Sequence, residues 1–209
     1  MTPSSVPPGG PSRPAPRRSL KPLFAVLLMS LAPVIAAVIV YFYPALRPAE
    51  TTNYGTLYTP QRPMPSAADL PLATLDGQAF DLNSLKGKWV LAAAHGGACP
   101  PACARKLFII RNTHASQGKN VDRLVRVWFI TDDEPVPDKV LEAYRGTIMV
   151  RAKPEALARY LLDAGQPSLE GPLWIIDPLG NLILHYPPDT DPIRFRKDVS
   201  RLVYNSRIG

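Results

Sequence analysis

The sequence predicts one transmembrane helix followed by a single α/β domain. Three observations favour this fold class: an apolar run near the amino terminus, alternating strand-like and helix-like segments further on, and two cysteines where a strand gives way to a helix. The chain has 209 residues, of which 46% are hydrophobic, so a packed core can form. This length allows one domain of ordinary size with additional segments rather than two full domains.

Residues 23–43 (LFAVLLMSLAPVIAAVIVYFY) contain no charged side chain. As a helix this segment would be about 31 Å long, which matches the roughly 30 Å hydrocarbon core of a bilayer. Pro33 should kink this helix without ending it, because lipid offers the backbone no other hydrogen-bonded state. The run is longer than the apolar part of a signal peptide and no clean cleavage site follows it, so we expect a retained span.

The charges near this span indicate its orientation. Four basic residues and no acidic residue precede it: Arg13, Arg17, Arg18 and Lys21. This asymmetry predicts that the span crosses the inner membrane with the amino terminus in the cytoplasm and the carboxyl-terminal domain in the periplasm. Residues 1–22, which are rich in proline, are then a disordered cytoplasmic tail, and residues 44–69, with five prolines, are a stalk. Residues 70–209 form the exported domain.

Composition excludes several classes of function. The net charge is +7, but after residue 44 the chain carries 20 basic and 17 acidic residues, so we expect no nucleic-acid partner. Two cysteines exclude a multi-disulfide scaffold and a four-cysteine zinc site. The sequence also lacks a glycine-rich phosphate-binding motif, so nothing favours nucleotide chemistry.

The first half of the exported domain predicts a hairpin, a central strand and a helix. The hairpin covers residues 72–82 and turns at Asp76-Gly77. Residues 88–94 (KWVLAAA) are an almost continuous apolar run, which is typical of a strand covered on both faces. A helix follows over residues 99–114, with an inner stripe at helical spacing: Cys103, Leu107, Ile110 and His114.

The second half continues the alternation. A strand (126–131), a helix (137–144), a short strand (147–150), a helix (154–164), a hairpin (173–176 and 182–186) and a last helix from Pro192 follow in order. The hairpin turns at an Asp-Pro-Leu-Gly sequence suited to a type I turn, and Asp191 caps the last helix. This order is that of a thioredoxin-like three-layer sandwich with an N-terminal β-hairpin extension.

The two cysteines, in the sequence HGGACPPAC, form the candidate site. Cys99 lies where the central strand gives way to the helix, and Cys103 lies one turn further on. The N–H groups and dipole of a helix start stabilise a thiolate, and residues four apart can form a disulfide after a small adjustment. The pair could cycle between dithiol and disulfide, or hold Cu(I) as two thiolates. The alternative is an inert disulfide, although so short a loop would stabilise the fold only weakly.

Three further residues are candidates for this site. Pro172 immediately precedes the strand LWIID, where thioredoxin-like proteins place a cis-proline facing the cysteines; an ordinary trans loop proline is the alternative. His95, four residues before Cys99, could stabilise its thiolate or act as a metal ligand. His185, on the last strand, could face the same site or be a partly exposed strand residue.

The apolar span, the stretch LPLATLDGQAFDLNSLKGKWVLAAA, the CPPAC pair and GPLWIIDPLGN together resemble the SCO/SenC family of cytochrome oxidase assembly factors, over about residues 68 to 205. This resemblance implies a membrane-anchored thioredoxin-like protein that acts on the copper centre of cytochrome c oxidase subunit II, or with another assembly factor. By it, Cys99 and Cys103 correspond to the family's copper and redox cysteines. The family's third copper ligand is a histidine, whereas this sequence has Ser168-Leu169-Glu170 in that region.

The missing histidine favours thiol chemistry over copper storage. We therefore expect a thiol-disulfide oxidoreductase that needs no cofactor and assists oxidase assembly, with Cys99 as the attacking thiolate, Cys103 as the resolving thiol and Pro172 shaping the groove. One alternative is a Cu(I) chaperone that uses both cysteines with His95 or His185. Another is a redox-inactive assembly scaffold.

Overall fold

The structure is a computed structural model that describes residues 20–43, 53–163, 165–166 and 168–209. These residues form two compact units, one before residue 52 and one from residue 52 onward, which we treat separately. Nearly all of the predicted tail, and residues 44–52 of the predicted stalk, lie outside the described residues.

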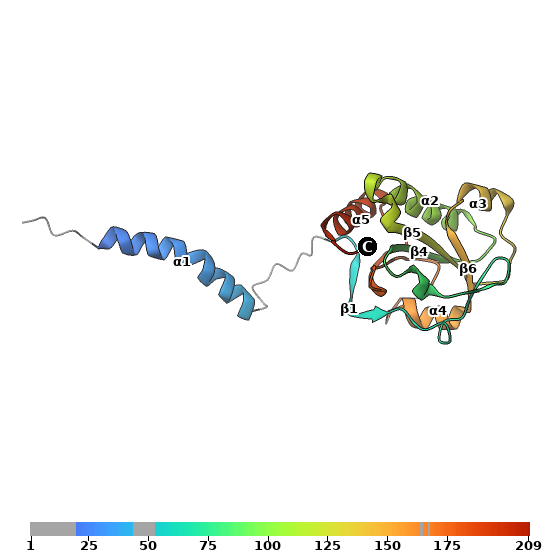
Figure 1. Ribbon diagram of the computed structural model, residues 1–209, viewed down its shortest axis with the longest axis horizontal. Coiled ribbons are helices and arrows are strands. Elements are labelled where there is room, and N and C mark those ends of the chain that lie inside the picture. Colours follow the sequence, from blue (N-terminus) through green and yellow to red (C-terminus); the bar gives the residue numbers. More distant parts are fainter. Residues whose placement is uncertain (1–19, 44–52, 164, 167) are drawn as a thin grey trace, which may run out of the picture. The chain divides into compact units, whose positions relative to one another are not determined.

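The first unit is the helix α1 (Lys21–Phe42), which has 22 residues and is apolar throughout most of its length. At 1.5 Å per residue it measures about 33 Å, enough to cross a bilayer's hydrocarbon core. It contains Pro33 and bends along its length (Figure 1), as expected where proline removes a backbone donor. Length and composition therefore identify α1 as a candidate membrane span.

The second unit is built on one mixed sheet of eight strands in the order β1-β8-β7-β4-β5-β6-β2-β3. The strands are β1 (Thr56–Pro63), β2 (Leu72–Thr74), β3 (Ala79–Phe80), β4 (Trp89–His95), β5 (Leu124–Ile130), β6 (Ile148–Ala152), β7 (Leu173–Ile176) and β8 (Asn181–Tyr186). The helices are α2 (Pro101–Ala115), α3 (Asp138–Ala143), α4 (Pro154–Leu161) and α5 (Pro192–Asn205), with 3₁₀ turns η2 (Leu82–Leu85) and η3 (Gly118–Arg123). β4 runs parallel to β5 and antiparallel to β7, and β5 runs parallel to β6.

Helices cover both faces of the sheet, as the three-layer prediction requires. α2, α3 and α5 lie on one side and α4 on the other (Figure 1). The side chains of β4 alternate between two hydrophobic clusters, one packed against α2 and α5 and the other against α4. All seven residues of β4 are buried, which explains its continuous apolar sequence. The expected strands and helices are present, with boundaries within three residues of those predicted.

The prediction of a stalk up to residue 69 is wrong from residue 53 onward. Thr56–Pro63 forms the edge strand β1, which pairs with β8, and Tyr58 and Met64 are buried. The Tyr58 hydroxyl donates to the Leu161 carbonyl, and the Arg62 guanidinium donates to the Leu162 carbonyl at 2.6 Å. Prolines are tolerated here because an edge strand leaves part of its backbone unpaired, so proline content alone does not identify a linker.

Asp198 of α5 anchors the start of the domain. Its carboxylate, only 5% exposed, accepts hydrogen bonds from the backbone N–H groups of Tyr54 at 2.7 Å and Gly55 at 3.1 Å. The Tyr186 hydroxyl lies 3.5 Å from the same oxygen. One buried carboxylate thus joins α5 to the segment that leads into β1.

We predict that Asp198→Ala lowers the free energy of unfolding of the domain by about 3 kcal/mol, because it leaves two N–H groups without their charged acceptor. Urea denaturation followed by circular dichroism measures this change. Asp189→Ala, which removes an exposed carboxylate nearby, is the matched control and should change stability by less than about 0.5 kcal/mol. Equal losses in the two variants would contradict the anchoring role.

Candidate functional site

The candidate site lies at the carboxyl end of β4, in the middle of the sheet. β4 ends at His95, and the turn Gly96–Ala98 leads to Cys99 just before α2. The first helical residue is Pro101, and Pro100 caps the helix with extended backbone angles. Both prolines fit the helix start because no amide donor is needed in its first turn. The central strand and the helix start therefore fix the position of the cysteines from both sides.

The turn after β4 is packed tightly against the segment that follows β5. The Asp132 carboxylate accepts hydrogen bonds from the Gly97 N–H at 2.7 Å and the Glu134 N–H at 3.2 Å. A Cβ atom on Gly96 would collide with the Asp132 carboxylate, and one on Gly97 would collide with the Glu134 carbonyl oxygen. Two glycines are therefore needed here because the neighbouring segment approaches so closely.

Cys99 and Cys103 are joined by a disulfide bond, with their Cα atoms 5.0 Å apart. Cys99 has φ of +45°, which makes it the one non-glycine residue with positive φ in the described part of the chain. This left-handed backbone costs about 1–2 kcal/mol and brings Cys99 back over the first turn of α2. Cys99 is 8% exposed and Cys103 is 1% exposed, so the first sulfur is at the edge of the core and the second is inside it.

A group of ionisable side chains lies close to the helix start. His95 is 7% exposed, its Nδ1 accepts from the Gly96 N–H at 2.9 Å, and its Nε2 is 3.5 Å from the Glu170 carboxylate. Burial lowers the pKa of His95, and nearby Glu170 opposes this effect. Lys106, one turn after Cys103, is 6% exposed, and burial lowers its pKa while Glu170 raises it. Glu170 is thus the carboxylate that raises the pKa of both His95 and Lys106 against the effect of burial.

The structure places His95 on the same side of the sheet as the cysteines. Along β4, Trp89, Leu91 and Ala93 belong to the cluster that includes Cys99 and Cys103, and His95 continues this alternation. His95 is therefore the histidine whose position agrees with a role beside the disulfide.

The alternative that His185 faces the cysteines is wrong. His185 pairs with Trp174 across β8 and β7, so the two side chains point to the same face. Trp174 belongs to the cluster under α4, and the Tyr58 ring of that cluster lies 5.2 Å from the His185 ring. Its Nδ1 is 2.8 Å from the Gln166 amide. The pairing register, which the sequence alone did not reveal, decides this orientation.

The expectation of a cis bond before Pro172 is also wrong. Among the described residues the cis peptide bond is Thr59–Pro60, so the Gly171–Pro172 bond is trans. Trans is the default for any X–Pro bond, and Leu173 pairs with Ala93 of β4 immediately after it. Pro172 lines a cavity of about 390 Å³ with Tyr54 and Tyr186, and neither cysteine is part of that lining.

Of the copper ligands expected, Cys99, Cys103 and His95 lie on one side of the sheet and His185 does not. His185 lies on the opposite face, and Glu170 faces His95 from the region in which the SCO/SenC family carries its histidine. Within the described ranges, no group of three or more His, Cys, Asp or Glu side chains could hold a metal ion. Both cysteine sulfurs are bonded to each other in this oxidised form, so a copper site would require the reduced pair.

Sequence reasoning missed Asp132, Glu170 and Lys106. Lys106 follows Cys103 by three residues, so helical spacing could have placed it on the buried side of α2. Glu170 lies in the region where SCO/SenC proteins carry a histidine that this sequence lacks. The missing histidine is the signal that could have drawn attention to this residue. Asp132 follows a predicted strand parallel to β4, and the carboxyl ends of parallel strands meet at one edge of a sheet.

We predict that the free energy of unfolding of the domain falls as the pH is lowered from about 7 to 5. Burial lowers the pKa of His95, His114 and His185 below the usual 6.5, so the unfolded chain takes up protons in a range where the folded chain stays neutral. Urea denaturation at several pH values measures this slope, and His114→Gln should flatten it. A domain that is as stable at pH 5.5 as at pH 7.5 would contradict the prediction.

Comparison with known proteins agrees with this architecture. The family model described as the transmembrane-like, thioredoxin-like, C-terminal domain matches residues 89–206, more than half of the chain. No curated protein sequence matches the chain.

Similar solved structures include apo Sco1 from Thermus thermophilus, which is 20% identical with a TM-score of 0.53, covering 72% of this chain and 96% of that one. Copper-bound Sco1 from yeast is 14% identical with a TM-score of 0.52, covering 74% and 90%. A thiol:disulfide interchange protein from Bacteroides sp. is 17% identical with a TM-score of 0.51, covering 70% and 91%. At these identities the likeness concerns the fold.

The thioredoxin-like fold, and the resemblance to SCO/SenC proteins at the level of that fold, are thus confirmed. The stretch matched by the family model begins at Trp89, the first residue of β4, and continues beyond the end of α5. It includes the disulfide and the helices on both faces of the sheet. The chain belongs to the family of transmembrane-like, thioredoxin-like C-terminal domains.

Proposed function

We propose that this protein is a membrane-anchored thiol-disulfide oxidoreductase that exchanges its Cys99–Cys103 disulfide with cysteines of a partner protein. One observation carries the proposal: the two sulfurs are bonded at the start of α2, one at the edge of the core and the other within it. Such a pair offers one sulfur for attack and protects the second until the first has reacted.

The exchange consists of two consecutive substitutions at sulfur, in each of which one bond forms and one breaks. In the reduced protein the Cys99 thiolate attacks a partner disulfide, which forms a mixed disulfide and releases one partner thiolate. The Cys103 thiolate then attacks the Cys99 sulfur, which forms the intramolecular bond and releases the second partner thiolate. Two electrons pass to the partner in total, and a dithiol donor must reduce the protein again. The reverse sequence would oxidise a partner.

The helix start supplies the electrostatic contribution to this chemistry. The free N–H groups and the positive end of the α2 dipole favour the thiolate form of a cysteine at this position. The Tyr144 hydroxyl donates to the Ala104 carbonyl at 2.7 Å and so holds the first turn of α2. Beside this helix start, burial lowers the pKa values of His95 and Lys106, and Glu170 partly opposes this effect.

The proposal also covers the orientation of the protein in the membrane and the kind of partner on which it acts. The basic residues before α1 support a cytoplasmic amino terminus, which would place the disulfide on the periplasmic side, where disulfide chemistry is common. The resemblance to SCO/SenC proteins supports a role in cytochrome c oxidase assembly, with subunit II or another assembly factor as the partner.

We predict that Cys103→Ser accumulates a mixed disulfide through Cys99 when mixed with a model peptide disulfide, because the resolving thiol is gone. Cys99→Ser should slow exchange at least 100-fold, because Cys103 is buried. Non-reducing electrophoresis and mass spectrometry follow both outcomes. Ala102→Ser, at the exposed residue between the cysteines, keeps both thiols and serves as the control. Unchanged exchange by Cys99→Ser would refute this mechanism.

A Cu(I) chaperone remains the alternative, favoured by the closeness of the two sulfurs and by His95 on their side of the sheet. Anaerobic Cu(I) titration of the reduced protein separates the two functions. Tight 1:1 binding that is lost in His95→Ala and kept in His185→Ala, together with no thiol exchange, would establish the copper function. His185 is a suitable control because its side chain lies on the opposite face of the sheet.

A further inference from the structure

The net positive charge of the thioredoxin-like domain is concentrated on α5. Residues 53–209 contain nineteen Lys and Arg against sixteen Asp and Glu, a net charge of +3. α5 has four Lys and Arg against one Asp, which is also +3, so the rest of the domain is neutral. The single acid, Asp198, is buried against the backbone of Tyr54 and Gly55. Its carboxylate thus contacts the segment that leads into β1 and is not part of the exposed surface of the helix.

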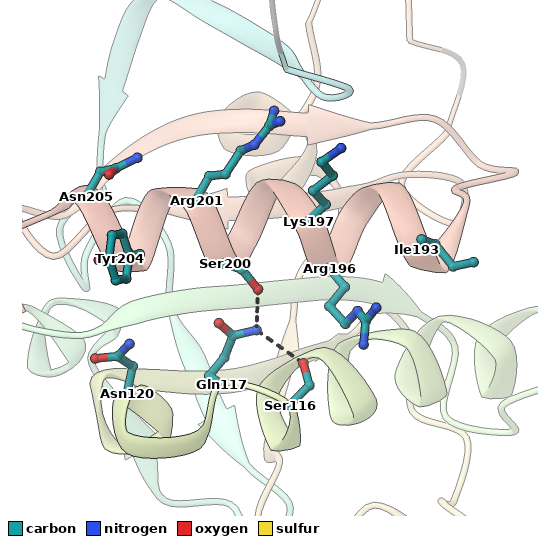
Figure 2. A pocket seen from close by; sticks show the side chains of 10 residues that line it. All are labelled: Ser116, Gln117, Asn120, Ile193, Arg196, Lys197, Ser200, Arg201, Tyr204 and Asn205. Atoms are coloured by element: carbon teal, nitrogen blue, oxygen red, sulfur yellow. Dashed lines mark hydrogen bonds between the residues drawn. The ribbon is translucent and has the colours of Figure 1, made fainter.

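A groove of about 550 Å³ lies between α5 and the carboxyl-terminal end of α2 with the adjoining η3 (Figure 2). We call it the α2–α5 groove. Arg196 extends from α5 toward α2, whereas Lys197 and Arg201 lie along the other side of α5 (Figure 2). The Gln117 side chain, just after α2, donates to Ser200 Oγ at 3.2 Å. This hydrogen bond connects the end of α2 to α5. Three cationic residues belong to the lining of this groove, although only the Arg196 side chain extends into the space between the helices; the ten lining residues include no acidic one.

α5 also exposes apolar side chains beside these charges. Ile193, near its start, is 69% exposed and Tyr204, near its end, is 78% exposed, and both line the groove. The inner face of the helix is already used, because Phe195 and Val199 are buried in the core. The outward face therefore combines cations with an exposed aromatic and an exposed aliphatic side chain.

We propose that the α2–α5 groove binds the phosphate headgroups of anionic phospholipids. Arg and Lys pair strongly with phosphate, and tyrosine and aliphatic side chains are favoured at headgroup depth, just above the hydrocarbon. An acidic peptide would match the cations but would not account for Ile193 and Tyr204. The same chain contains α1, which is long and apolar enough to span a bilayer, and only residues 44–52 separate it from the domain. So short a tether provides lipid at a high effective concentration.

Lipid binding at this groove would leave the disulfide accessible to a partner. Cys103 and Ser116 are thirteen residues apart along α2, a distance of about 20 Å at 1.5 Å per residue. The groove and the redox pair are thus at opposite ends of one helix. The proposal does not depend on the thiol chemistry, so either can fail without the other.

Hydrogen-exchange mass spectrometry of the full chain tests this proposal in nanodiscs of phosphatidylcholine alone and of phosphatidylcholine with one-third phosphatidylglycerol. We expect α5 peptides to exchange about tenfold more slowly in the anionic nanodiscs, since each Lys or Arg near an anionic surface contributes appreciably to binding. The protection should disappear at about 0.5 M salt, where the Debye length is only about 4 Å.

Charge-matched variants identify the groove as the binding site. Arg196→Gln, Lys197→Gln and Arg201→Gln combined should abolish the protection. The control Lys139→Gln, Arg145→Gln and Arg159→Gln, which removes the same charge from exposed positions elsewhere, should retain it. If the groove variant does not fold, Arg196→Gln alone should reduce the protection about threefold.

Three results would overturn the proposal. The first is equal exchange of α5 in the two kinds of nanodisc. The second is protection that persists in the groove variant. The third is protection by poly-glutamate in neutral nanodiscs without protection by anionic lipid, which would identify a docking site for an acidic protein segment instead.

Discussion

The close contact between the turn after β4 and the segment after β5 is the constraint on which the candidate site depends. Asp132 accepts hydrogen bonds from Gly97 and Glu134, and the two glycines allow the backbones to approach. Cys99 then emerges in a left-handed conformation over the start of α2, within bonding reach of Cys103. Without this contact, no local interaction would hold Cys99, which precedes α2, next to Cys103, which lies within α2.

The sequence predicts most of the domain because its elements carry local signals. β4 is recognisable from its apolar run, α2 from its helical stripe and α5 from its cap at Asp191, whose carboxylate accepts from the Ile193 and Arg194 N–H groups. β1 was missed because its prolines suggest an extended linker. Its pairing with β8 is a long-range contact that no local pattern encodes.

The site is predictable in part for the same reason. His95 ends β4 and the cysteines follow it directly, so chain order alone places them together. The direction of the His185 side chain and the peptide bond before Pro172 depend on strand register and geometry set by distant segments. His185 is the partly exposed strand residue that the sequence allowed as one alternative, whereas the expected cis bond before Pro172 is wrong. Glu170 comes from a third segment and reaches His95 only in the folded chain. The carboxylate that influences the ionisation of His95 and Lys106 is therefore a product of the tertiary fold.

The central claim is that Cys99 is the reactive sulfur of a reversible pair. Timed alkylation of the reduced, folded full chain, followed by peptide mapping, tests it most directly. The account predicts that Cys99 is labelled well before Cys103, and that reoxidation before labelling protects both through one intramolecular bond. Equal labelling of the two thiols, or a pair that forms no bond on oxidation of the folded chain, would contradict it.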